Sequence, residues 1–159
     1  MDRAGAAPDV DVSRVMAASP DEIWAAWNDP ASIAQWWGPA GFTSTVLALD
    51  LSDGGRFEVV MHAPDGTDFA NVYVFESVDP ARELVYVHQG SQAWGLAPSR
   101  SVVTIEVQDT DAPRCRVTLR SYYASEEDRR RHLEDFHAVE GARQLLERLD
   151  VAAGSRQAG

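Results

Sequence analysis

The spacing of the apolar residues changes twice along the chain. Between residues 19 and 37 they recur at helical spacing, from Phe42 to Tyr122 they alternate with polar residues, and after residue 125 the helical spacing returns. Turn sequences divide the alternating stretch, among them Gly54-Gly55, Pro64-Asp65-Gly66 and Asp79-Pro80. Together with a first strand near the N-terminus, this pattern predicts seven strands, at residues 10–16, 43–51, 56–62, 68–78, 83–88, 102–108 and 114–122.

Helix signals flank these strands. Ser19-Pro20-Asp21-Glu22 contains the cap, the first-turn proline and the acidic residue that begin a helix, and Asn28-Asp29-Pro30 ends it. A second short helix is expected to reach the pair Trp36-Trp37. A long helix begins at Ser125 and is expected to end near Ala152, before Gly154. Its apolar stripe consists of Phe136, Val139, Ala142, Leu145, Leu146 and Leu149.

The order of these elements predicts an α+β domain. Consecutive hairpins favour a seven-stranded antiparallel sheet, with two short helices after the first strand. One long amphipathic helix needs a large concave partner, and a strongly twisted sheet that curls around the helix provides it. The chain of 159 residues has the length of one domain. We expect this domain at residues 10–152, with a disordered tail at 1–9 and a second tail at 153–159.

Composition and charge exclude several classes of partner. A net charge of -11 gives a field that repels phosphate backbones, so we expect no nucleic acid. Hydrophobic residues make up 45% of the chain without a long apolar run, so no membrane is expected. All 14 basic residues are arginine, which excludes a catalytic lysine. The single cysteine, Cys115, and the lack of a signal-like N-terminus favour the cytoplasm.

Two adjacent tryptophans followed by a Gly/Pro turn are rare. Because neighbouring residues cannot share one helix face, one indole of Trp36-Trp37 can reach the core while the other lines a rim or a cavity. Further short motifs occur around this pair in a fixed order, and they are Trp24-Ala25-Ala26-Trp27, Asn28-Asp29-Pro30, Trp36-Trp37-Gly38-Pro39, Gly41-Phe42, Gly54-Gly55, Pro64-Asp65-Gly66 and Val139-Glu140-Gly141.

In these motifs the chain resembles the activator of heat-shock-protein-90 ATPase homologue-like family, within the SRPBCC (START/birch-pollen-allergen-like) superfamily, from about Val10 to Ala152. The resemblance implies a helix-grip fold, in which the sheet wraps the C-terminal helix around a cavity. In this superfamily the cavity usually holds an apolar or aromatic small molecule. The family also makes a homodimer plausible, although no apolar stripe of this sequence supports one.

The chain departs from the family in two respects. The family often has a tryptophan after Glu140-Gly141, where this chain has Ala142, so we expect an enlarged cavity there. The eukaryotic co-chaperone that gave the family its name also carries a separate N-terminal domain, for which 159 residues leave no room. We therefore do not expect its chaperone function to be inherited.

The strand pattern suggests which side chains face the cavity. If Pro64-Asp65-Gly66 forms a tight two-residue hairpin, then Phe57, Val59 and Met61 share one face with Val72 and Val74. Aromatic and amphipathic side chains near strand ends supply both apolar area and a polar group, which favours Trp36, Tyr86, His88 and Trp94 as ligand contacts. Ala142 and Leu146 are the candidate ligand contacts on the long C-terminal helix. The candidate ligand-binding residues are therefore Trp36, Phe57, Val59, Met61, Val72, Val74, Tyr86, His88, Trp94, Ala142 and Leu146.

No reactive constellation stands out in the sequence. His132 and His137 are five residues apart, too far round a helix to chelate a metal together, and one cysteine cannot form a thiolate cluster. We therefore predict no metal, no cofactor and no catalytic residue. Cys115 is interpreted as a small buried apolar residue. Glu76, Asp50 or Asp53 could supply a carboxylate, but pairing with arginine or exposure to water is the more common role of such residues.

These observations lead to one hypothesis and two alternatives. The first is a binding protein whose cavity takes up a small hydrophobic or aromatic molecule, with the long helix and residues 89–99 gating access. The second is an enzyme similar to the superfamily's cyclases and dehydratases, which requires at least two of Tyr86, His88 and Glu76 inside the cavity. The third is a chaperone ATPase regulator that acts through its surface.

Overall fold

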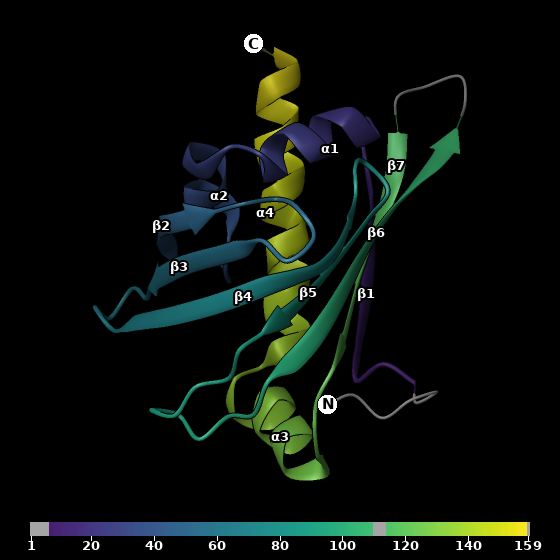
Figure 1. Cartoon of the computed structure of the whole chain (residues 1–159). Helices are drawn as coiled ribbons and strands as arrows, with labels where there is room; N and C mark the ends of the chain where they lie inside the picture. Colours follow the sequence, from purple (N-terminus) through teal and green to yellow (C-terminus); the bar gives the residue numbers. More distant parts are fainter. Residues whose placement is uncertain (1–6, 110–113, 159) are drawn as a thin grey trace.

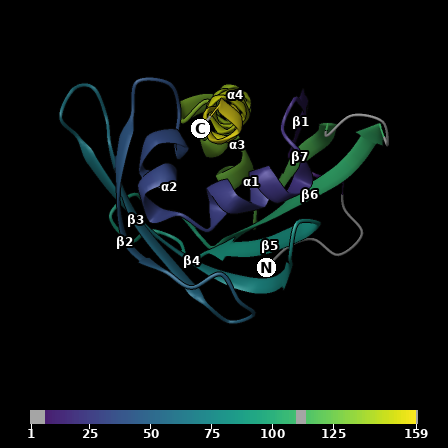
Figure 2. The ribbon, with the colours of Figure 1, turned by 90° about the horizontal axis from the view of Figure 1, so that it is seen from above.

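A curved sheet surrounds one long helix in the computed structural model, which describes residues 7–109 and 114–158. The long helix runs through the centre of Figure 1, two short helices cross one end of the sheet, and a helical turn closes the opposite end. Seen from above, the sheet curves so that its concave face is turned towards the long helix (Figure 2). This is the helix-grip arrangement that the sequence predicted.

The sheet has seven antiparallel strands in the order β1-β7-β6-β5-β4-β3-β2, so that β1 and β2 form its edges. Every pair of neighbouring strands except β1 and β7 is consecutive in the sequence, as expected for a series of hairpins. The strands are β1 Val10–Met16, β2 Thr43–Leu49, β3 Arg56–His62, β4 Asp68–Asp79, β5 Glu83–His88, β6 Ser99–Asp109 and β7 Arg114–Tyr122. Strand β6 begins three residues before the predicted position.

The two short helices are α1, Pro20–Trp27, and α2, Pro30–Trp36. Helix α1 has the predicted capping box, because the Glu22 amide donates to Ser19 Oγ over 3.2 Å and the Ser19 amide donates to Glu22 Oε1 over 2.9 Å. The Asp29 carboxylate caps α2 by accepting from the Ala31 amide over 3.0 Å. These caps fix where each helix begins.

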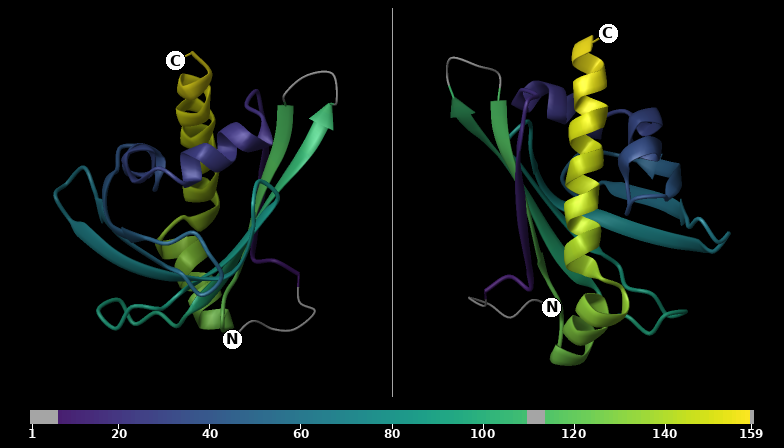
Figure 3. Two further views of the ribbon diagram at one scale, coloured as in Figure 1. Left: turned by 45° about the horizontal axis from the view of Figure 1, so that its top comes forward. Right: turned by 180° about the vertical axis from the view of Figure 1, so that it is seen from behind.

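The C-terminal helical region is broken, which the sequence did not predict. It consists of α3, Glu126–Arg130, a π-helical turn η1, Arg131–Asp135, and α4, Ala138–Ala158. The break is a residue in the left-handed region, His137, at φ 52°. Gly154 lies within α4 and does not stop it. The two halves of the predicted helix therefore take different directions at residues 136–137, as Figure 3 shows from behind.

The hairpin between β3 and β4 corrects one prediction. Ala63 pairs with Thr67 and Gly66 has φ 92°, so the loop contains three residues, Pro64 to Gly66, and not two. One extra loop residue shifts the register by one position and turns every β4 side chain to the other face. Asn71 and Tyr73 consequently share a face with Val59 and Phe57.

Val72 and Val74 were therefore assigned to the wrong face. They pair with Glu58 and Arg56 on the convex side of the sheet. The hydrophobic core lies between the concave face, α1, α2 and α4, and its largest fully buried side chains include Trp27, Trp36, Phe57 and Phe75. No helix in the described part of the chain is both long and apolar enough to span a membrane.

Candidate functional site

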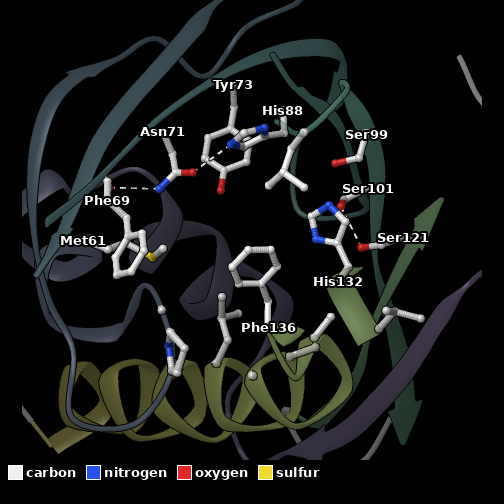
Figure 4. A pocket seen from close by; sticks show the side chains of 18 of the residues that line it. Met61, Phe69, Asn71, Tyr73, His88, Ser99, Ser101, Ser121, His132 and Phe136 are labelled. Atoms are coloured by element: carbon white, nitrogen blue, oxygen red, sulfur yellow. Dashed lines mark hydrogen bonds between the residues drawn. The ribbon is translucent and has the colours of Figure 1, made fainter. Parts of the chain in front are cut away.

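A cavity of about 330 Å³ lies between the concave face of the sheet and the start of α4. The inner faces of strands β3 to β7 form its floor, and α4 contributes Ala138, Gly141, Ala142 and Leu145. The loop after α2, the loop between β5 and β6, and η1 with the following Phe136 close its sides. Figure 4 shows these side chains pointing into one shared space.

One side of the cavity is apolar. Phe42 contacts Phe69 with ring centroids 6.2 Å apart, Phe69 contacts Trp94 at 5.3 Å, and Trp94 contacts Phe136 at 6.2 Å. Met61 lies beside Phe69 on this side (Figure 4). A continuous series of rings from four different segments therefore offers apolar area to a bound molecule.

The floor contains an aromatic cluster. Trp37 contacts Tyr73 at 5.5 Å between ring centroids, and Tyr73 contacts Tyr86 at 5.4 Å with the rings nearly perpendicular. Burial raises the pKa values of Tyr73 and Tyr86 far above their usual range. Both phenols therefore keep their protons at neutral pH and remain hydrogen-bonding groups without charge.

His88 faces the cavity with both ring nitrogens engaged. The Gly90 amide donates to Nδ1 over 2.9 Å, so Nε2 carries the proton and donates to Asn71 Oδ1 over 2.7 Å. The Asn71 amide in turn donates to the Phe69 carbonyl over 3.0 Å, which fixes its orientation. Burial lowers the pKa of His88 to about 4, with a smaller contribution from the nearby His132. His88 is therefore a neutral and rigid part of the wall.

The end of the cavity near β6 and β7 is polar. Ser101 and Ser121 face each other across the two strands with their hydroxyl oxygens 2.8 Å apart, and Ser99 continues this row (Figure 4). His132 closes the end from η1, and its ring stacks on that of Tyr123 with centroids 4.1 Å apart. Its Nε2 is buried and has no hydrogen-bond partner within the described residues. Burial lowers the pKa of His132.

Arg148 on α4 holds the loop that carries Trp37 against the cavity. Its Nη1 donates to the carbonyls of Gly38 and Pro39 over 3.0 and 2.8 Å, and its Nη2 donates to that of Phe42 over 2.8 Å. The same side chain also donates to the carbonyls of Gln35 and Trp37. One guanidinium thus donates to five carbonyls at the end of α2 and in the turn after it.

The structure places five of the predicted ligand contacts in the cavity wall, namely Met61, Tyr86, His88, Trp94 and Ala142. The remaining six do not line it. Trp36 is 1% exposed and donates from its indole to the Ala26 carbonyl over 3.4 Å, so the cavity receives Trp37 and the core receives Trp36. Phe57 and Val59 are buried behind the wall, Val72 and Val74 lie on the convex face, and Leu146 lines a crevice between β1 and α4.

Several wall residues were missed by the sequence analysis. Asn71, Tyr73 and Phe69 follow directly from the corrected register of β4. Ser99 and Ser101 continue the alternation of Val103 and Ile105 towards the start of β6. The sequence contains this signal, but the predicted strand began only at residue 102 and therefore excluded both serines. His132 and Phe136 depend on the π-helical turn, for which the sequence offers no comparable signal.

The structure does not bring all of the candidate catalytic residues together in the cavity. Tyr86 and His88 meet in the cavity, as the enzyme hypothesis requires, but Glu76 is exposed and pairs with Arg100 over 2.7 Å. Cys115 is fully buried, and burial raises the pKa of its thiol to about 11. Over the described ranges, no three histidine, cysteine or acidic residues come close enough together to hold a metal ion.

Comparison with known proteins places this geometry in a family. The model of the activator of Hsp90 ATPase homolog 1-like proteins matches residues 17–154. The chain belongs to this family. Its fold is generally one that binds ligands. A search of curated proteins gave no match.

Solved structures of bacterial proteins share the fold. A solution structure from Arthrobacter aurescens is 24% identical with a TM-score of 0.80, covering 91% of this chain and 85% of the other. A crystal structure from Mycobacterium smegmatis is 27% identical with a TM-score of 0.76, covering 89% and 87%. A third, from Nitrosomonas europaea, is 20% identical with a TM-score of 0.79, covering 97% and 100%.

Proposed function

We propose that this member of the family binds a small hydrophobic or aromatic molecule in the cavity between the sheet and α4. The observation that carries the proposal is the cavity itself, which measures about 330 Å³ and is lined chiefly by aromatic and aliphatic side chains. This volume lies within the range of small-molecule sites, and a few placed polar groups within an apolar lining are typical of such sites.

We expect access to the cavity to run past the loop between β5 and β6. Ser91, Trp94 and Leu96 from this loop line the cavity, and the Trp94 side chain is 42% exposed. The loop is tied to the helical region by two hydrogen bonds, from the Ala97 amide to Asp128 Oδ2 and from Arg131 Nη1 to the Gly95 carbonyl, each 3.0 Å long. We expect the Trp94 ring to open and close the cavity while these two bonds hold the base of the loop.

The cavity favours binding over catalysis. General acid–base catalysis would need a group that exchanges a proton near neutral pH. The pKa of His88 is lowered to about 4 and Nδ1 is occupied by the Gly90 amide, while burial keeps Tyr86 protonated. Tyr86 and His88 could still orient a substrate, so the cyclase or dehydratase alternative predicts turnover of a molecule that the cavity binds.

A thermal-shift screen of apolar and aromatic metabolites tests the proposal. A ligand at 100 times its dissociation constant stabilises the folded protein by about 2.7 kcal/mol, a clear rise in melting temperature. Each hit is then incubated with the protein, and its mass is checked for conversion. Binding without conversion supports a binding protein, conversion supports the enzyme alternative, and a complete lack of hits contradicts the proposal.

A further inference from the structure

The polar groups that line the cavity are all uncharged at neutral pH. They are phenols, serine hydroxyls, the Asn71 amide and two imidazoles with lowered pKa values. Within the described chain, no aspartate, glutamate or arginine side chain lines the cavity. A charged group that enters such a site loses its hydration without gaining a counter-ion, which is strongly unfavourable.

Charged residues beside the cavity wall are engaged elsewhere. Arg131 donates to the Gly95 carbonyl and lies over the outer ring of Phe136, with Cζ 5.8 Å from the ring centroid. Asp128 accepts from the Ala97 amide, and Arg148 is surrounded by loop carbonyls. The overall charge of -11 further disfavours the approach of anions. Neither a carboxylate nor an ammonium group therefore finds a partner inside.

The uncharged polar groups are not spread evenly. Ser99, Ser101, Ser121 and His132 lie together at one end, while Met61 and Phe69 lie at the other (Figure 4). His132 Nε2 is buried in this wall without a partner in the described structure, although buried polar atoms are normally hydrogen-bonded. The serines of the neighbouring strands already bond each other. One bond between two hydroxyls uses only one of their protons, so unused hydrogen-bonding capacity remains at this end on the serines as well as on His132.

We infer that the cavity selects a neutral aromatic molecule with one polar end, whose hydroxyl or carbonyl oxygen hydrogen-bonds at the end formed by Ser99, Ser101, Ser121 and His132 while its rings lie against Phe69 and Met61. This inference rests on the proposed function and adds the chemical class and the orientation of the ligand. A ligand hydroxyl can pair with a donor or an acceptor at this end, because a hydroxyl both donates and accepts, whereas a carbonyl needs a donor.

Four probes that share one ring system test the selectivity. They are naphthalene, 2-naphthol, 2-naphthoate and 2-naphthylmethylammonium, with affinities measured at neutral pH by calorimetry and by quenching of the tryptophan fluorescence, to which the wall residues Trp37 and Trp94 contribute. We expect 2-naphthol to bind about tenfold more tightly than naphthalene, as for one added hydrogen bond. Both ions should bind at least about 100-fold more weakly than 2-naphthol, since each leaves an unpaired charge in the cavity.

Variants locate the polar contact. His132→Phe keeps a ring for stacking on Tyr123 and should bring the affinity for 2-naphthol closer to that for naphthalene, while naphthalene binding stays unchanged. His132→Gln, which retains polar atoms, should keep part of the difference even if the phenylalanine variant folds poorly. His62→Phe is the matched control, because His62 does not line the cavity and bonds Thr45 and Asp68 instead.

The outcomes separate the two proposals. Equal or tighter binding of 2-naphthoate or the ammonium probe overturns the inference of a neutral ligand and leaves the binding function standing. A preference for 2-naphthol that persists undiminished in His132→Phe overturns the role of His132. If none of the four probes binds, the result counts against the proposed binding function itself.

Discussion

Arg148 and Pro39 are 109 positions apart in the sequence, and the guanidinium of the first donates to the carbonyl of the second over 2.8 Å. Around this bond the same side chain reaches further carbonyls of the loop, and Gln144 on α4 accepts from the Ala40 amide over 2.9 Å. Helix α4 therefore positions Trp37 and Pro39, both in the cavity wall, through the backbone of their loop.

The first prediction concerns this contact. Arg148→Met keeps much of the aliphatic stem but removes the guanidinium donors from the carbonyls of Gln35, Gly38 and Phe42, so we expect the free energy of unfolding to fall by about 2–4 kcal/mol in urea titrations. Arg148→Lys should recover only part of the loss, because an ammonium lacks the planar fork. Arg143→Met is the control, since among the described residues Arg143 forms one exposed pair, with Glu140 at 3.7 Å, and its loss should cost less than about 1 kcal/mol. Equal losses in the two methionine variants would contradict the prediction.

The second prediction concerns the volume of the cavity. Ala142 lines it from α4 and is 9% exposed, so Ala142→Trp should place an indole in the space that a ligand needs. We expect the affinity for any ligand found in the screen to fall at least about 100-fold, while the protein remains folded. Val151→Trp on the same helix, at a position that is 71% exposed, should leave the affinity unchanged. Titration calorimetry of the three proteins decides the question, and undiminished binding by Ala142→Trp would place the ligand elsewhere.

The third prediction concerns access. Trp94 bridges Phe69 and Phe136 at the rim, and Trp94→Ala removes both ring contacts. Each such contact contributes about 0.5–1.5 kcal/mol, so we expect the ligand to dissociate about tenfold faster in stopped-flow experiments. Association should accelerate as well, because a barrier to opening is removed. Unchanged rates in both directions would exclude a gating role for Trp94.

The fourth prediction concerns pH. The pKa of His88 is about 4 in the folded protein and near 6.5 in the unfolded chain, so between these values the unfolded state binds more protons. Stability is therefore unaffected above the unfolded pKa and falls as the pH is lowered from about 6.5 to 4, by about 2–3 kcal/mol in total. His132, whose pKa is also lowered, acts in the same direction.

Urea titrations across this pH range measure the effect. His88→Gln removes the titrating group, so its stability should depend less steeply on pH than that of the wild-type protein, whatever its absolute stability. Identical slopes for the two proteins would show that His88 does not titrate as described.

The fifth prediction compares two glycines. A Cβ at Gly55 would lie 2.0 Å from the Asp50 carbonyl oxygen, whereas nothing lies within 4 Å of a Cβ at Gly154 inside α4. Gly55→Ala should therefore destabilise the protein by about 2–3 kcal/mol through displacement of backbone. Gly154→Ala should stabilise it by about 0.5–1 kcal/mol, as alanine favours a helix. Melting temperatures that shift in the same direction would contradict this account.

The sequence predicted the architecture well, because alternation and turn residues are local signals. The boundaries of β1, β3, β5 and β7 match the prediction, and so does the capping box at Ser19. Local signals were less informative about the cavity. A two-residue and a three-residue hairpin are both compatible with Pro64-Asp65-Gly66, and this single difference turned Val72 and Val74 away from the site.

Two other features of the cavity depend on tertiary packing. Adjacent tryptophans must diverge, but the packing of α2 against α1 decides that Trp36 enters the core and Trp37 the cavity. The apolar stripe after Ser125 predicts one unbroken helix. In the structure, the π-helical turn and the left-handed backbone of His137 redirect the chain and bring His132 to the polar end of the cavity. Contacts between distant segments, not local propensity, select these conformations.

The attachment of the loop at residues 37–42 to α4 uses main-chain carbonyls, and every amino acid supplies one. Side chains in this loop are therefore free to be exchanged without loosening the anchor, as long as the turn itself is preserved. Relatives of this chain could thus acquire new ligand preferences through substitutions in this loop while the arginine at position 148 stays unchanged.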